Sequence, residues 1–373
     1  MAGSSFGTIF KITTWGESHG DGIGVVVDGC PAGIPLSLEQ VQAYLNRRKP
    51  GQTRYSTPRK ENDNVVIRSG LFEGHTTGTS ILMAVYNETQ RSADYSEIAG
   101  YYRPGHADFT YDAKYGFRDY RGGGRSSGRE TIGRVAAGAL AGAFLKELGI
   151  TVTAYTKSIG PIQASPSSLT TLITERDASP LFMPGKEASD QAEEYLQGTM
   201  KEFDSAGGII ECIISGMPSG IGDPVFEKLD ANLAKAIFSI GAVKGVEIGA
   251  GFSCATATGS KNNDAILGVK NGHAVKATNH AGGILGGISD GSDIILRAAI
   301  KPTPSIFKEQ QTIRRDGSPV SVQIKGRHDP VIVPRAVVVV EAMAALVLAD
   351  ALLVNMGARM DRIREFYNFS REK

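Results

Sequence analysis

The sequence contains few cysteines and almost no net charge. Its 373 residues include three cysteines, Cys30, Cys212 and Cys254, and none belongs to a Cys-x-x-Cys pair. This spacing argues against a disulfide framework or a zinc site, so no metal centre is expected. Free thiols in a reducing compartment are expected instead. The 40 basic residues nearly match the 39 acidic ones, which leaves a formal net charge of +1. The chain as a whole therefore lacks the field that attracts nucleic acid or a membrane surface.

Three further signals are missing. The N-terminus has no basic segment followed by an apolar run, so no secretory signal is predicted and a cytoplasmic protein is expected. No Gly-x-Gly-x-x-Gly opens a helix after a strand, which argues against a tightly held nicotinamide cofactor. The longest apolar run, 336–354, is interrupted by Glu341 and Asp350. A membrane span would have to bury both acids, so this run is predicted to be a core helix started by Pro334.

The segment from Tyr120 to Gly149 is a glycine-rich basic loop that leads into a long run of small and apolar residues. Ser127 and Glu130 have the spacing of a capping box, so a helix is predicted to begin there and to end at Gly149. Both faces of this helix are small or apolar, which indicates a core helix. Backbone amides at its start favour an anion site, flanked by Arg121, Arg125, Arg129 and Arg134. A solvated loop or a nucleic-acid-binding segment is the alternative for such a loop.

Two histidines lie in glycine-containing motifs. The first is Gly16-Glu17-Ser18-His19-Gly20 before a predicted strand, and the second is Arg103-Pro104-Gly105-His106-Ala107-Asp108. Histidines near anion-binding arginines are suited to acid–base chemistry on a phosphorylated substrate, although a structural role for each stays open. The basic loop 47–60 fits a small anion or nucleic acid, and the balanced net charge favours the small anion.

Periodicity predicts the remaining elements. Strands are expected at 23–28, 65–68, 80–87, 150–156, 208–215, 245–249, 293–300 and 320–325. Helices are expected at 37–47, 188–203 and 224–240, the first with a capping box from Ser37 and Gln40. Residues 160–186 are rich in Ser, Thr and Pro and are predicted to be irregular.

Short motifs recur along the chain. Lys301-Pro302 echoes Arg103-Pro104, and Arg327 before the second core helix echoes Arg129 before the first, with the same separation in both pairs. We infer an internal duplication within a single domain 1–373, with pseudo-repeats 1–156 and 208–355 and an insertion 157–207. The two core helices, 129–148 and 334–355, are then expected to be neighbours.

Taken together, these motifs resemble those of one family, chorismate synthase. The matching stretches follow the family's order across nearly the full chain and are 16–31, 103–108, 122–140, 279–287, 301–303 and 327–341. The resemblance implies an α+β fold, a β-α-β sandwich with core helices between two antiparallel sheets, in a homotetramer. It also implies a 1,4-trans elimination of phosphate from 5-enolpyruvylshikimate 3-phosphate, giving chorismate and using reduced FMN without net redox change. The partner is then a small phosphorylated molecule, with no role for nucleic acid or a membrane.

The resemblance also implies residue roles. His19 is similar to the acid that protonates the departing phosphate, and His106 to the group that handles the proton on reduced flavin. Ser18, Ser127 and Asp329 match polar groups near flavin N5, with Asp329 returning the proton. The positions that match substrate-binding residues are Arg48, Arg54, Arg129 and Arg327. Those that match flavin-binding residues are Arg125, Ser126, Ser127, Gly241, Ala242, Gly286, Lys301, Pro302, Thr303, Pro304, Ser305 and Arg327. Many members have Asn-Ala where this chain has Gly241-Ala242, so only a backbone contact to flavin is expected there.

Two other classes of protein fit part of the same residues. A nucleic-acid-binding protein would use the basic stretches 47–60 and 121–134 as a phosphate track, which a salt titration of RNA binding would reveal. A flavin-free enzyme acting on phosphorylated sugars or acids would share the arginines and histidines, and would not bind FMN. The sequence indicates neither the presence nor the absence of an NADPH-dependent flavin reductase activity.

Overall fold

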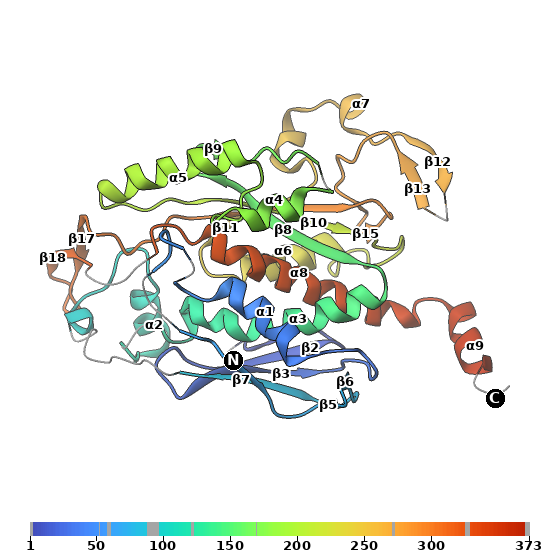
Figure 1. Cartoon of the computed structure of the whole chain (residues 1–373), viewed down its shortest axis with the longest axis horizontal. Helices are drawn as coiled ribbons and strands as arrows, with labels where there is room; N and C mark the ends of the chain where they lie inside the picture. The colour runs from blue at the N-terminus through green and yellow to red at the C-terminus, as the bar shows by residue number, and fades with distance from the viewer. Residues whose placement is uncertain are drawn as a thin grey trace.

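The molecule contains two five-stranded antiparallel sheets (Figure 1). The computed structural model describes residues 3–51, 53–57, 61–87, 97–120, 123–168, 170–270, 273–324 and 329–369. The first sheet has the order β1 (Ser5–Phe6), β2 (Lys11–Gly16), β3 (Gly22–Asp28), β7 (Ile81–Tyr86) and β4 (Val65–Ile67). The second has the order β11 (Val243–Ile248), β16 (Ile294–Ile300), β10 (Gly208–Ser215), β8 (Thr151–Ile159) and β9 (Ile162–Gln163). Helices together with antiparallel sheets confirm the predicted α+β class.

Helices fill the space between the sheets (Figure 1). α3 (Thr131–Glu147) contacts β3 and β7, and α8 (Val333–Val354) contacts β8 and β10. α1 (Leu38–Arg48) packs on both helices, and α6 (Leu229–Phe238) packs on α8. A Cβ built on Gly138 of α3 would lie 2.3 Å from the Cβ of Ala342, so the two core helices touch with almost no side chain between them. Their predicted contact is confirmed.

The two acids in the apolar run of α8 both have partners inside the protein. Glu341 accepts hydrogen bonds from Arg47 Nη1 at 2.6 Å, Arg176 Nη1 at 2.9 Å and the Ala154 amide at 2.8 Å. Asp350 accepts from three backbone amides of residues 8–10. The segment Val333–Gly357 is apolar enough to cross a membrane, with a mean hydropathy of 2.5, yet 72% of it is buried within the protein. It is a core helix, as predicted.

One of the two predicted capping boxes forms and the other does not. Ser37 and Gln40 cap α1 reciprocally. Ser127 instead accepts from the Arg129 amide at the start of a short 3-10 turn, and α3 begins only at Thr131. The carboxylate of Glu130 turns away from the helix end, because it accepts from Thr14 Oγ1 at 2.8 Å and from Arg134 Nε at 2.7 Å.

The prediction that 160–186 is irregular is wrong in part. This segment contains β9 and the helix α4 (Leu172–Ala178), which is anchored by buried Leu172 and by the pairing of Arg176 with Glu341. All three cysteines are free thiols, of which Cys30 and Cys212 are buried and Cys254 is exposed.

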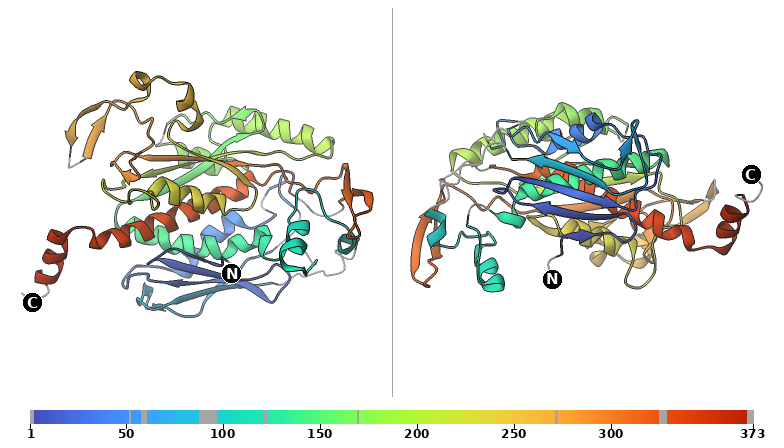
Figure 2. Two further views of the ribbon diagram at one scale, coloured as in Figure 1. Left: turned by 180° about the vertical axis from the view of Figure 1, so that it is seen from behind. Right: turned by 90° about the horizontal axis from the view of Figure 1, so that it is seen from below.

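Several elements have no counterpart among the predicted ones. They are α2 (Asp108–Tyr115), α7 (Gly259–Asn262), α9 (Met360–Phe369) and the hairpins β5–β6 (Leu71–Phe72, His75–Thr76), β12–β13 (Ile266–Lys270, His273–Lys276), β14–β15 (Ile284–Leu285, Ile288–Ser289) and β17–β18 (Glu309–Ile313, Pro319–Gln323). Of the last hairpin, β18 does overlap the predicted strand 320–325, and the helix α5 (Lys186–Lys201) overlaps the predicted helix 188–203. Figure 2 shows that β12–β13 and α9 extend away from the layered body.

Candidate active site

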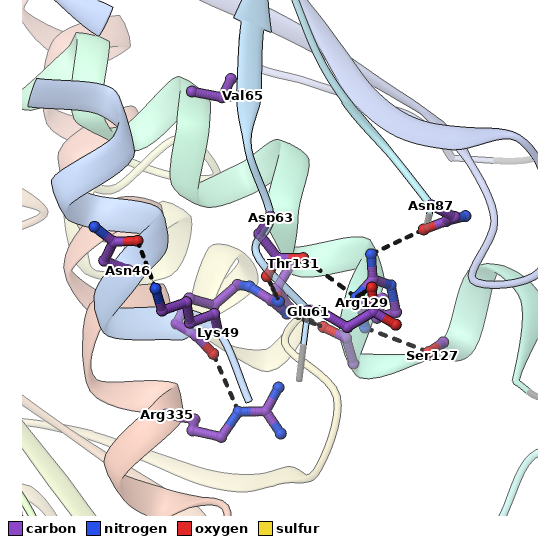
Figure 3. A network of polar contacts seen from close by, with 12 residues as sticks. Asn46, Lys49, Glu61, Asp63, Val65, Asn87, Ser127, Arg129, Thr131 and Arg335 are labelled. Atoms are coloured by element: carbon purple, nitrogen blue, oxygen red, sulfur yellow. Dashed lines mark hydrogen bonds and ion pairs between the residues drawn. The ribbon is translucent and has the colours of Figure 1, made fainter. Parts of the chain in front are cut away.

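Residues from four separate segments meet near the beginning of α3 (Figure 3). They come from the end of α1, the segment before β4, the end of β7 and the loop before α3. Arg48, Asp63 and Arg129 are named here the arginine cluster. The Asp63 carboxylate is paired with Arg48 Nη2 through Oδ2, and its Oδ1 lies 3.2 Å from Arg129 Nη1. One carboxylate therefore holds two guanidinium groups.

The arginine cluster is almost entirely removed from solvent. The side chain of Asp63 is 0% exposed, and that of Arg48 is 2% exposed. Asp63 has a φ of 48°, in the left-handed region that Asp tolerates better than most residues. Since buried charges are stable only when they are paired and hydrogen-bonded, each member depends on the other two. Arg129 keeps a 10% exposed side chain and is the member nearest to solvent.

Asn87 connects the arginine cluster to the turn that carries His19. Its Oδ1 accepts from Arg129 Nη2 at 2.8 Å, and its Nδ2 donates to the carbonyls of Glu17 at 3.0 Å and Gly20 at 2.7 Å. One amide thus links Arg129 to the backbone of the turn that carries the half-buried His19. The Ser18 hydroxyl in the same turn is buried and has no hydrogen-bond partner among the described residues.

The loop before α3 is tied to the end of β2. Arg125 donates from Nη1 to the Gly16 carbonyl at 3.0 Å and from Nη2 to Thr14 Oγ1 at 2.6 Å. Ser126 donates to the Gly123 carbonyl at 2.6 Å. These side chains hold the loop in place, so what the loop presents outward is mainly backbone.

A second group of residues surrounds His106 and is named here the histidine corner: Gly105, His106, Lys301, Pro304 and Ser305. Residues 103–106 form a turn in which the His106 amide donates to the Arg103 carbonyl at 3.2 Å, with Gly105 at a φ of 69°. Such a turn needs glycine at its third position, and proline is favoured at its second. Lys301 Nζ donates to the Gly105 carbonyl at 2.8 Å, and Ser305 Oγ lies 2.9 Å from His106 Nε2. The two predicted motifs 103–108 and 301–305 are thereby in contact.

Asp108 stabilises this turn from behind. Its carboxylate accepts from Arg103 Nε and Nη2, both at 2.7 Å, and lies 2.9 Å from Arg118 Nη1. Burial opposes ionisation of Asp108, but the hydrogen bonds and positive charge of Arg103, together with Arg118, outweigh it and lower its pKa. The group is therefore a carboxylate at neutral pH.

The 301–305 loop also reaches the Gly241-Ala242 pair. The Lys301 amide donates to the Ala242 carbonyl at 2.9 Å, and Ala242 has a φ of 74°. Burial, with the charge of Lys244, lowers the pKa of Lys301. Thr303 Oγ1 is buried and has no hydrogen-bond partner among the described residues.

Asp329 lies beside the arginine cluster. It accepts from the Thr57 amide at 2.8 Å and from Arg335 Nη1 at 2.6 Å, and Arg335 Nε donates to the Arg48 carbonyl at 3.1 Å (Figure 3). Burial lowers the pKa of Arg335, and the Asp329 carboxylate opposes that shift. One side chain of α8 therefore links Asp329 to α1.

The remaining predicted residues do not join these groups. The side chain of Arg54 is 66% exposed and pairs with Glu193 of α5 at 2.7 Å. Gly286 is in the turn of the β14–β15 hairpin, and Figure 1 places that hairpin and α2 towards opposite ends of the molecule. Arg121 and Arg327 lie outside the described residues.

Asp63, Asn87 and Asp108 hold the site together and were not among the predicted site residues. The signal that could have found them is their position, because Asp63 lies just before the predicted strand 65–68, Asn87 ends the predicted strand 80–87 and Asp108 ends the histidine motif. Among the described residues, no cluster of three or more His, Cys, Asp or Glu side chains is placed to hold a metal ion.

Paired arginines next to a histidine turn define an enzyme that acts on an anionic substrate. The family model described as chorismate synthase matches residues 10–353. A chorismate synthase of Lachnoclostridium phytofermentans is 68% identical over 372 residues, covering 98% of this chain and 100% of that protein. One of Chloroflexus aggregans is 51% identical over 360 residues, covering 96% and 98%. A crystal structure of chorismate synthase matches with a TM-score of 0.75 and 30% identity, covering 98% and 99%.

This chain belongs to the chorismate synthase family. It is an enzyme of the shikimate pathway, a lyase that removes phosphate from 5-enolpyruvylshikimate 3-phosphate to give chorismate.

Proposed function

We propose that this chain eliminates phosphate with reduced FMN as a cofactor that is recovered in every cycle, and that His19 and Arg129 handle the departing group. The observation that supports this most directly is the Asn87 amide, which binds Arg129 and the backbone of the His19 turn at once. A cation and a proton donor are thereby kept at one place. A leaving phosphate needs both, because protonation and charge-assisted hydrogen bonds lower the energy of the departing anion.

The arginines divide their tasks according to burial. Arg129 is buried but keeps a 10% exposed side chain, and it is proposed to contact a substrate anion directly. Arg48 is buried together with Asp63, and its positive charge acts on the anion site from inside the protein. Arg54 lies on the surface against α5, and it is proposed to contribute to substrate binding from there. Together these residues meet a substrate that has one phosphate and two carboxylates.

The residues present fit a flavin. Ser18 Oγ and Thr303 Oγ1 are buried hydroxyls with no hydrogen-bond partner among the described residues, and buried polar groups of this kind are rare unless a ligand completes them. Ring and phosphate groups would be held by the backbone of residues 125–127, by the Gly241-Ala242 pair, by the loop 301–305, by Arg327 and by Gly286. The chemistry that such a flavin would supply when bound is transient electron donation without net redox change. Ser127 and Asp329 are proposed to face it, and His106 to hold its proton.

Phosphate release under anaerobic conditions tests the proposal. Purified protein with 5-enolpyruvylshikimate 3-phosphate is expected to release phosphate when FMN and dithionite are present, and not with oxidised FMN. Many product molecules are expected per flavin, since the cofactor is not consumed. A rate independent of flavin would favour a plain phosphate lyase, and consumption of one electron pair per product would refute the cofactor's role.

Single substitutions test the assigned residues. His19→Ala and His106→Ala are each expected to lower turnover at least about ten-fold, because general acid–base groups contribute about 10²–10⁴. Arg129→Ala and Arg327→Ala are expected to raise KM for the substrate more than they lower kcat. If both histidine variants turned over substrate at the parental rate, the two histidines would have structural roles only.

We further propose a single domain with duplicated halves 1–156 and 208–355 around the insertion 157–207, its layers forming a β-α-β sandwich. Support comes from α3 and α8, which each follow a basic segment and pack against each other. Superposing the two halves with their helices matched would test it, and an arrangement of strands that does not superpose would contradict it.

The proposed assembly is a homotetramer in the cytoplasm. Closed symmetry is the common form of soluble enzymes, and three free thiols agree with a reducing compartment. Light scattering of the purified protein would give the mass of the assembly, and a monomer or dimer mass would contradict the tetramer.

A further inference from the structure

The imidazole of His106 has a hydrogen-bond partner at each nitrogen. Nδ1 lies 3.0 Å from the Pro104 carbonyl oxygen, and Nε2 lies 2.9 Å from Ser305 Oγ. Ser305 is 7% exposed, so its hydroxyl meets the ring in a largely dry environment. The two partners differ chemically, and this difference determines where the ring can exchange a proton.

A carbonyl oxygen can only accept a hydrogen bond, whereas a hydroxyl can donate or accept. The contact with Pro104 therefore requires a hydrogen on Nδ1 in both protonation states of the ring. In the neutral ring, Nε2 carries a lone pair and accepts from Ser305 Oγ–H. In the charged ring, Nε2–H donates to the same oxygen after the hydroxyl rotates. The serine keeps its own proton throughout, and only Nε2 gains or loses one.

The backbone around both partners is fixed. Lys301 Nζ donates to the Gly105 carbonyl, and the Lys301 amide donates to the Ala242 carbonyl. A Cβ on Gly105 would lie 2.7 Å from the Cβ of Pro304, so the two loops are already in close contact. Ser305 is thus presented to the ring by a loop that is anchored at several points.

We propose that Ser305 is a positioning residue for His106. Together with the Pro104 carbonyl, it restricts the gain and loss of a proton by the imidazole ring to Nε2. The inference rests on the proposed role of His106 in proton handling. It assigns Ser305 a task that differs from contacting a flavin, because the serine acts through the histidine and accommodates both of its charge states.

Nitrogen NMR of the free protein tests the tautomer without flavin or substrate. In protein labelled with ¹⁵N at its six histidines, the His106 signals are identified by their loss in His106→Ala. Above the pH at which the ring titrates, Nδ1 is expected to show the shift of a protonated nitrogen and Nε2 that of an unprotonated one. A neutral ring protonated at Nε2 would overturn the inference and leave the catalytic role of His106 standing.

A double-mutant cycle tests the role of the serine. Ser305→Ala is expected to lower kcat about ten-fold, the equivalent of one lost hydrogen bond, with KM for the substrate nearly unchanged. In the His106→Ala background the same change is expected to have less than about a two-fold effect, since the partner is gone. Ser305→Thr keeps the hydroxyl and is expected to restore most of the activity.

Ser205→Ala is the matched control. Ser205 Oγ donates to the Thr303 carbonyl at 2.7 Å, so it anchors the same loop without touching the ring. Its effect on kcat is expected to be small and equal in both backgrounds. An effect of Ser305→Ala that persists in His106→Ala, or that Ser205→Ala reproduces, would overturn the inference. Parental turnover of His106→Ala would instead refute the proposed role of His106, and the inference with it.

Discussion

The arginine cluster and the histidine corner are stabilised by different forces. The arginine cluster is a buried set of full charges, with Asp63 and Arg48 withdrawn from water. The histidine corner is half-buried and consists of hydrogen bonds from side chains to carbonyls and to a hydroxyl. Buried ion pairs are costly to break, whereas a hydroxyl partner lets a ring change charge cheaply. A site that binds an anion and moves a proton needs one region of each kind.

The largest expected effect comes from removing the carboxylate of the arginine cluster. Asp63→Ala leaves the buried Arg48 guanidinium without its partner, and we expect a loss of about 3–5 kcal/mol in the free energy of unfolding. Urea denaturation with a comparison of m-values measures it.

Glu73→Ala is the control for this prediction. Glu73 has the same φ of 48° but is exposed in the turn between β5 and β6. Both variants place alanine in the left-handed region, so the difference between them isolates the buried charge. Equal losses in the two variants would show that backbone strain, and not the ion pair, stabilises this segment.

The next largest effect is expected in the histidine corner. Gly105→Ala adds a methyl group 2.7 Å from the Cβ of Pro304 at a φ of 69°, so overpacking adds about 1–3 kcal/mol to the strain. Turnover should fall as well, because the two loops are pushed apart. Gly116→Ala is the matched control, since its φ is 70° and nothing lies within 4 Å of the added methyl. If both variants lose the same stability in thermal or urea unfolding, the contact between the loops is unimportant.

Acid should weaken the histidine corner in a predictable direction. The pKa of Asp108 is lowered in the folded protein, so its contribution to stability is complete above about pH 4, the ordinary range of an Asp carboxyl. That contribution is lost as the pH falls through the lower folded-state pKa. The free energy of unfolding should be measured from about pH 3 to about pH 7 at intervals of about one pH unit. As the pH falls, it should decrease more steeply in the parent than in Asp108→Asn. Parallel curves would contradict the assignment.

The smallest effect on stability is expected for Arg54→Ala. This arginine pairs with Glu193 on the surface, and exposed pairs of this kind are screened by solvent. In salt, we expect the thermal unfolding midpoint of Arg54→Ala to equal that of the parent. We also expect a raised KM for the substrate, because Arg54 is proposed to contribute to substrate binding. A lowered midpoint with an unchanged KM would assign it a structural role instead.

The sequence predicted those parts of the fold whose causes are local. Spacing of apolar residues located α3, α8 and the strand β10, and the capping box at Ser37 formed as expected. The same spacing at Ser127 and Glu130 failed, because the Glu130 carboxylate accepts from Thr14, which is far away in the chain. Local rules describe what a residue can do, and a distant partner decides what it does.

The site shows the same division. Both histidine motifs and several arginines could be recognised from their neighbours in the sequence. The role of Asp63 could not be recognised from its neighbours, because it depends on Arg48 and Arg129, which come from other elements. Arg54 has the local setting of a site residue, yet contact with Glu193 of α5 holds it at the surface.

The hydrogen bonds that the amides of Thr8, Ile9 and Phe10 donate to the Asp350 carboxylate join segments up to 342 positions apart in the chain. During synthesis these amides emerge early, and their acceptor, the Asp350 carboxylate, is added only after the more than 300 residues in between. The first sheet and α3 can meet earlier, but α8 is synthesised after both sheets and packs on α3 late. Folding of this enzyme should therefore finish only after α8 has been synthesised, and truncation before α8 should leave an aggregation-prone intermediate.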